Sequence, residues 1–100
     1  MSHYILDEEG NVVPEPDIFK WAKWMQDGGR TLIKTLVDQI IVSTVFLVYD
    51  HRFGDEEGLP ILWETMIFGG KHDQYQERYS SKEDAIEGHN RAIKLVEEDS

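Results

Sequence analysis

The sequence contains no cysteine, which excludes disulfide bonds, thiolate zinc sites and thiol catalysis together. It also contains no apolar run near the roughly 20 residues that a membrane-spanning helix requires. Residues 1–9 have neither the basic start nor the apolar stretch of a secretory signal. These absences predict a soluble protein of the reducing cytoplasm that has no contact with a membrane.

Basic residues are scarce: ten Lys and Arg stand against twenty Asp and Glu, and the formal net charge is −10. Direct binding to nucleic acid is not expected, because attraction to a phosphate backbone needs clustered Lys and Arg. The natural electrostatic partners are basic proteins, including those with basic nucleic-acid-binding grooves. A simpler interpretation, that the acids keep a small domain soluble, stays open.

The remaining composition is that of a folded protein, with 40% hydrophobic residues and three prolines in 100 residues. A chain of this length forms one core, so residues 1–100 are predicted to be a single domain. No internal repeat or linker interrupts it.

Turn and capping residues divide the first part of the chain. Residues 4–6 and 12–13 are predicted to form a small hairpin around Gly10 and Asn11. Asp17 can cap a helix over residues 18–26, because its carboxylate accepts hydrogen bonds from first-turn amides. The spacing of this helix predicts a buried stripe of Ile18, Trp21, Ala22 and Met25, with Trp24 at its edge.

Beyond residue 30 the pattern changes to β-branched and aromatic residues, which predicts strands over residues 31–37, 40–49, 61–68 and 74–79. Asp38 and Gln39 form the first turn. Ser80 or Ser81 caps a last helix, to residue 97, whose predicted buried stripe is Ala85, Ile86, His89, Ala92, Ile93 and Val96. The expected fold is a small α+β domain, with a roughly four-stranded antiparallel sheet, one N-terminal-side helix and one C-terminal helix.

The two long strands are apolar on both faces. A sheet wetted on one side alternates apolar and polar residues, whereas residues 40–49 and 61–68 do not, so these strands are expected to be covered on both sides. Either one helix covers each face, or both helices share one face and the other contacts a partner or a second copy. With one helix on each face, Glu64 would be a paired, half-buried acid.

Histidines offer little chemistry. Asp50 and His51 could form an oriented acid/base pair, but a hydrogen bond that stabilises the turn is the simpler interpretation. His51 and His72 follow adjacent antiparallel strands and should lie at opposite ends of the sheet, so neither a metal site nor a cofactor is predicted. His89, beside Gly88, is expected to be a core histidine bonded to a strand or loop.

A second set of residues could receive a small anionic ligand, such as a nucleotide signal. It consists of Arg52, Phe53, Lys71, Tyr75 and Arg78. A chain this small makes a deep pocket most easily between subunits, so this hypothesis predicts a homo-oligomer.

Several of these segments resemble a widespread family of small uncharacterised proteins encoded by bacteriophages and prophages. The similar stretches, 39 residues in all, are residues 4–11, 14–17, 42–47, 50–51, 53–54, 62–70, 75–80 and 88–89. The resemblance brings no catalytic residue. It implies a phage accessory protein in the host cytoplasm, and small phage proteins with a known role commonly act by binding host machinery.

The leading hypothesis is therefore a non-enzymatic phage protein that binds and inhibits a host protein, such as an anti-CRISPR or another immune inhibitor. Its predicted partner-binding surface consists of the acidic loop Asp55, Glu56 and Glu57 and the exposed parts of the acidic helices. The oligomeric ligand-binding module is the alternative. An enzyme that uses Asp50, His51 and Glu64 ranks third, and a homodimer through a sheet face is a further expectation.

Overall fold

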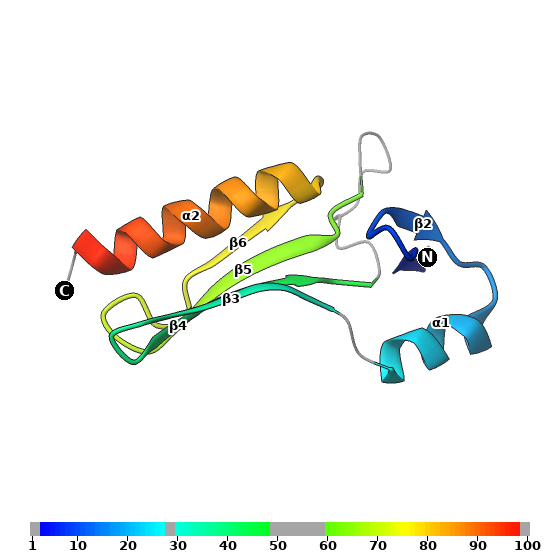
Figure 1. Cartoon of the computed structure of the whole chain (residues 1–100), viewed down its shortest axis with the longest axis horizontal. Helices are drawn as coiled ribbons and strands as arrows, with labels where there is room; N and C mark the ends of the chain where they lie inside the picture. Colours follow the sequence, from blue (N-terminus) through cyan, green and yellow to red (C-terminus); the bar gives the residue numbers. More distant parts are fainter. Residues whose placement is uncertain (1–2, 28–29, 49–59, 99–100) are drawn as a thin grey trace.

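In a computed structural model of the chain, the structure describes residues 3–27, 30–48 and 60–98. These residues form two helices, a two-stranded hairpin and a four-stranded antiparallel sheet, which confirms the predicted α+β fold (Figure 1). In chain order the elements are β1 (Tyr4–Leu6), β2 (Val12–Pro14), α1 (Ile18–Gln26), β3 (Thr31–Val37), β4 (Ile40–Phe46), β5 (Trp63–Phe68), β6 (Gln76–Tyr79) and α2 (Lys82–Glu98).

The larger sheet is a meander, in which the spatial order β3-β4-β5-β6 follows the chain. The predicted turn between β3 and β4 is confirmed: Asp38 and Gln39 have φ angles of 47° and 72°. Positive φ at both central residues is the geometry that matches the twist of a hairpin, and here it forms without glycine. The last strand begins at Gln76 rather than at residue 74, because Gln74 has a φ of 72° and belongs to the preceding turn.

The core lies between α2 and one face of the sheet, which we call the inner face. Cross-strand pairs on this face include Val42 with Ile67 and Phe46 with Trp63, and all four are at most 1% exposed. Ser81 accepts a hydrogen bond from the Asp84 amide at 3.0 Å, as expected of a helix cap. From α2 the buried residues are Ala85, Gly88, His89, Ala92 and Val96.

The predicted stripe of α2 was wrong at Ile86, which is 38% exposed. No residue of the stripe predicted for α1 is fully buried: Trp21, Ala22 and Met25 are half-buried and Ile18 is 53% exposed, because α1 does not lie on a sheet face. Instead, α1 and the β1–β2 hairpin lie beyond one end of the sheet (Figure 1). There the indole nitrogen of Trp21 donates to the carbonyl of Val48 at 3.0 Å, and Asp17 caps α1 as predicted.

The opposite face of the sheet, the outer face, has no described helix over it. Leu36 on β3 and Phe68 on β5 point outward from this face and are 71% and 42% exposed. The described residues therefore do not form the arrangement with one helix on each face. Among the residues that the structure describes, coverage of the central strands on both sides, which their apolar pattern predicted, is seen only on the inner face.

Candidate functional site

Many of the predicted site residues lie outside the described residues: Asp50, His51, Arg52, Phe53, Asp55, Glu56 and Glu57. The hypotheses that depend on them stay predictions. The structure does place Glu64, Lys71, His72, Tyr75, Arg78 and His89.

His89 lies in a buried polar belt between α2 and the middle of the sheet. Its Nδ1 is 2.7 Å from Thr44 Oγ1, its Nε2 is 2.9 Å from Thr35 Oγ1, and Thr44 Oγ1 is 2.5 Å from Thr65 Oγ1. Burial lowers the pKa of His89 below its ordinary value, so the ring is neutral at pH 7. Both ring nitrogens are bonded to threonine hydroxyls, as expected of a core histidine, which leaves neither of them for a substrate.

Tyr75 belongs to a second polar group at the edge of the inner face. Its hydroxyl donates to Glu77 at 2.7 Å, and Arg91 donates to the other oxygen of that carboxylate at 2.7 Å. The hydrogen bond to Glu77 raises the pKa of Tyr75 to about 12, and the same bond lowers the pKa of Glu77. Each group is therefore held in its ordinary charge state at neutral pH.

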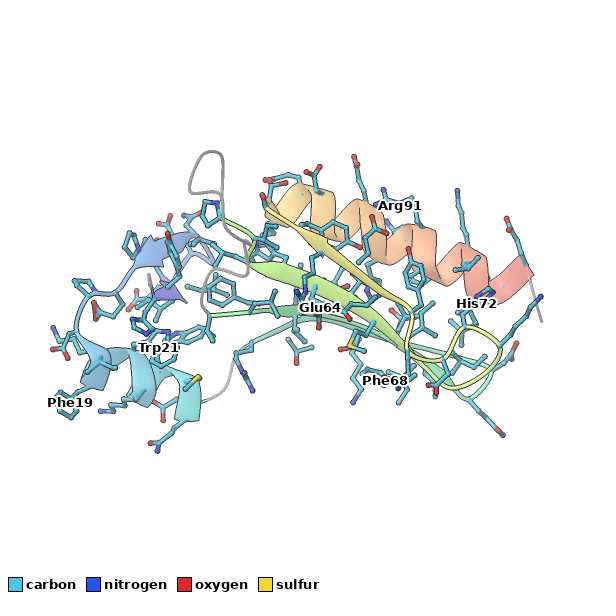
Figure 2. The ribbon with its side chains drawn as sticks, turned by 180° about the vertical axis from the view of Figure 1, so that it is seen from behind. Phe19, Trp21, Glu64, Phe68, His72 and Arg91 are labelled. Atoms are coloured by element: carbon cyan, nitrogen blue, oxygen red, sulfur yellow. The ribbon has the colours of Figure 1, made fainter. Side chains whose placement is uncertain are left out.

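Glu64 lies on the outer face, where one of its oxygens accepts from Arg78 Nε at 2.8 Å and from Gln76 at 2.6 Å (Figure 2). This is a paired acid rather than a free acid/base group. Arg78 thus points to the outer face, whereas Tyr75 packs against the inner-face core. Lys71 is exposed in the turn between β5 and β6. The described members of the predicted anion site do not all converge on one point within the chain.

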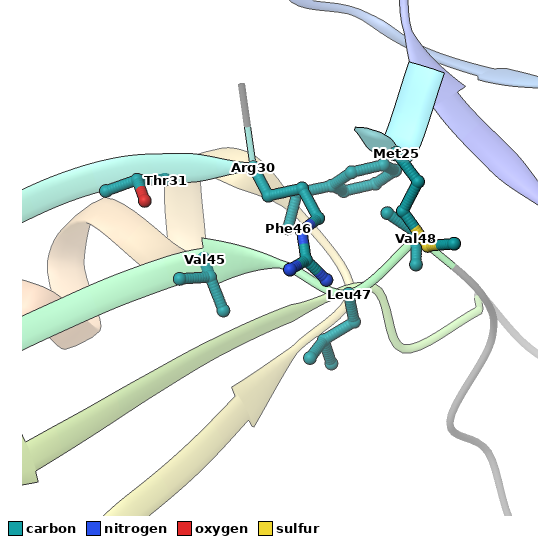
Figure 3. A pocket seen from close by; sticks show the side chains of 7 residues that line it. All are labelled: Met25, Arg30, Thr31, Val45, Phe46, Leu47 and Val48. Atoms are coloured by element: carbon teal, nitrogen blue, oxygen red, sulfur yellow. The ribbon is translucent and has the colours of Figure 1, made fainter. Parts of the chain in front are cut away.

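A shallow cavity of about 330 Å³ lies between the end of α1 and the adjoining ends of β3 and β4 (Figure 3). Its lining residues are Met25, Arg30, Thr31, Val45, Phe46, Leu47 and Val48. The polar groups of these side chains are one guanidinium and one hydroxyl. Ligand sites usually add several convergent polar groups to an apolar wall, so this cavity supports no specific ligand.

Among residues 3–27, 30–48 and 60–98, no group of three His, Asp or Glu side chains could hold a metal ion. Within the same residues, no helix has the length and apolar content needed to cross a bilayer.

The strongest chemical feature of the described surface is an acidic end, which combines the tip of the β1–β2 hairpin with the first turns of α2. The two segments lie side by side, since Lys82 Nζ lies 3.3 Å from where a Cβ on Gly10 would stand. Within these two described segments Lys82 is the one base, and six acids are exposed: Asp7, Glu8, Glu9, Glu83, Asp84 and Glu87.

Sequence reasoning identified the acidic helix surface but missed the hairpin tip. The Glu8–Glu9 pair looks like an ordinary solvated turn in the sequence. It gains significance only because the fold brings it to the start of α2, more than 70 residues later.

Comparison with protein-family models, with curated proteins and with solved structures gives no match.

Proposed function

We propose that the protein is a small, acidic, non-enzymatic phage accessory protein that binds and inhibits a host protein in the host cytoplasm. The observation that carries the proposal is the acidic end, where the two segments that meet at Lys82 and Gly10 carry six exposed acids. Such a patch attracts a basic surface, increases the rate of association and excludes acidic competitors. The basic groove of a nucleic-acid-binding enzyme has the complementary charge, which suits counter-defence roles such as inhibition of a CRISPR effector.

The state of the buried and paired groups supports a binding role over an enzymatic one. Among the described residues, His89 is bonded to threonines, Glu77 to Tyr75 and Arg91, and Glu64 to Arg78 and Gln76. Each of these groups is occupied by the chain itself, and none is poised for proton transfer to a substrate.

The test is capture of host proteins from bacterial lysate by tagged wild-type protein and by charge-reversed variants. Glu87→Lys and Glu8→Lys should each weaken retention of a stoichiometric basic protein at least several-fold, because each places a cation on the contact surface. The matched control is Glu98→Lys, an exposed acid on the same helix but roughly 16 Å from Glu87 along the axis.

High salt should release the same protein, because exposed charges are screened over a distance of about 10 Å at 0.1 M ionic strength. Equal retention by wild type, Glu87→Lys and Glu8→Lys would remove the acidic end from the proposal. Purified partner and protein should then be mixed, and a partner that keeps its full activity when bound would overturn the inhibitory role.

A further inference from the structure

The outer face of the sheet carries three cross-strand rows of side chains. The first row is Leu36, Ile41 and Phe68. The second is Lys34, Ser43, Met66 and Gln76, and the third is Thr31, Val45, Glu64 and Arg78. The first row is wholly apolar and the third contains an ion pair, so the face has one apolar end and one charged end.

Addition of another strand at either edge of the sheet is disfavoured. The β3 edge has an irregular register between Thr31 and Ile33, and Lys34 occupies its middle. The β6 edge is only four residues long and carries Glu77 and Arg78. Bulges, central lysines and short charged edge strands are the usual features that prevent edge-to-edge pairing. A partner of this sheet is therefore expected to contact the outer face rather than an edge strand.

The small formal charge of the outer face favours a second copy of this chain as its partner. Glu64 and Arg78 neutralise each other, so Lys34 leaves the three rows with a formal charge of +1, whereas the whole chain has −10. A basic protein of the kind attracted to the acidic end is not attracted here. The face is close to neutral, so two copies can bring it together without the strong repulsion that acidic surfaces of a chain of net charge −10 would cause.

We propose that the outer face binds the outer face of a second copy, around a two-fold axis that runs along β4. In this orientation Leu36 lies over Phe68 of the second copy, and Ile41 lies over its own counterpart. Lys34 is offset by one row, about 7 Å along the strands, from Glu64 of the second copy, and the two long side chains can meet across the gap between the sheets. The two sheets stack in the aligned manner of β-sandwiches, and α2 forms the outermost layer on each side.

A two-fold axis across the strands would instead place Phe68 over the Glu64–Arg78 pair of the other copy. That arrangement would bury the ion pair against an aromatic ring and cost desolvation energy, which selects the axis along β4. Three strands of each copy, β3 to β5, overlap about this axis, and about seven residues of each give a footprint of roughly 350 Å² per copy. This is about half of what stable complexes bury per partner, so the dimer should be in equilibrium with the monomer.

Sedimentation over a wide range of protein concentrations tests the association. The mass of the wild type should rise toward twice the chain mass of 11.7 kDa, and added salt should favour the dimer because it screens the repulsion between acidic copies. The double variant Leu36→Gln/Phe68→Gln should stay monomeric. The matched control Ile18→Gln/Phe19→Gln should still dimerise, because it removes exposed apolar groups from α1 instead (Figure 2).

Cross-linking tests the orientation, because a single introduced cysteine is the only one in the chain. Stacked sheets lie about 10 Å apart, beyond the reach of a disulfide, so a short bis-maleimide should link Ile41→Cys to its counterpart. Glu87→Cys on α2 should stay unlinked. A wild type that is monomeric at every concentration, a face variant that still dimerises, or equal linking at positions 41 and 87 would each overturn the proposal. None of these outcomes bears on the acidic end.

Discussion

The two faces of one sheet differ in how their side chains are satisfied. On the inner face the central threonines are buried and bonded within the chain, since Thr44 and Thr65 are 0% exposed, bond to each other, and Thr44 also bonds to His89. On the outer face apolar residues such as Leu36 stay 71% exposed. The strands are comparably apolar on both sides, so the difference comes from which face another element of the chain returns to cover. An apolar strand face is therefore evidence of a contact, and the described part of the chain provides that contact for only one of the two faces.

Truncation of one aromatic residue on each face of β5 should produce the largest contrast. Trp63→Ala should lower the free energy of unfolding by about 3–5 kcal/mol, because it leaves a cavity in the core where Trp63 is 1% exposed. Phe68→Ala, on the same strand but 42% exposed, should cost less than about 1 kcal/mol. Urea denaturation at a protein concentration that favours the monomer measures both. Equal losses would show that the two faces are equivalent in the isolated chain.

Gly88→Ala should produce an intermediate effect from the helix side of the inner face. A methyl group at this position would collide with the ring and hydroxyl of Tyr79, which is 7% exposed and cannot move into solvent. We expect a loss of about 1–3 kcal/mol, as for other overpacked cores, even though alanine is the better helix former. The thermal unfolding midpoint of Gly88→Ala should be compared with that of Ser43→Ala, a small change on the outer face. A lower midpoint for Gly88→Ala alone would assign the effect to the inner face. An unchanged or higher midpoint for Gly88→Ala would contradict the close contact.

The smallest expected effect is a pH dependence that only the inner face carries. Because burial lowers the pKa of His89, the unfolded chain takes up a proton below about pH 6.5 that the folded chain does not. The stabilising contribution of neutral His89 is therefore complete above that pH and decreases as the pH falls toward the folded-state pKa. The slope should not exceed about 1.4 kcal/mol per pH unit, and His89→Gln should lack it. Denaturation curves at several pH values measure the difference, and parallel profiles for the two proteins would show that His89 is not desolvated.

Local signals in the sequence predicted most of the fold. Asp17 caps α1, Ser81 caps α2, and the Asp38–Gln39 turn joins β3 to β4, because each feature depends on residues within a few positions of one another. The exposure of Ile18 was not predictable, since helical spacing shows which side of a helix is apolar but not what it rests on.

The candidate surfaces were predictable only in part, for the same reason. His89 was correctly expected to bond to a strand, but its partners depend on the register that brings Thr35 and Thr44 under α2. The acidic end likewise depends on the packing of the hairpin tip beside Lys82. Contacts between segments far apart in the chain follow from tertiary structure, which no local pattern specifies.

The buried threonine pair also determines how β4 and β5 align. Thr44 lies opposite Thr65, and a slide of two residues would place it opposite Ile67 or Trp63 instead. A two-residue slide keeps every side chain on its original face, so the apolar pattern alone would not reject it. It would separate the buried hydroxyls of Thr44 and Thr65, at a cost of roughly 1–3 kcal/mol for a buried hydroxyl left without its partner. The polar belt therefore selects one alignment among several that the hydrophobic effect alone would accept.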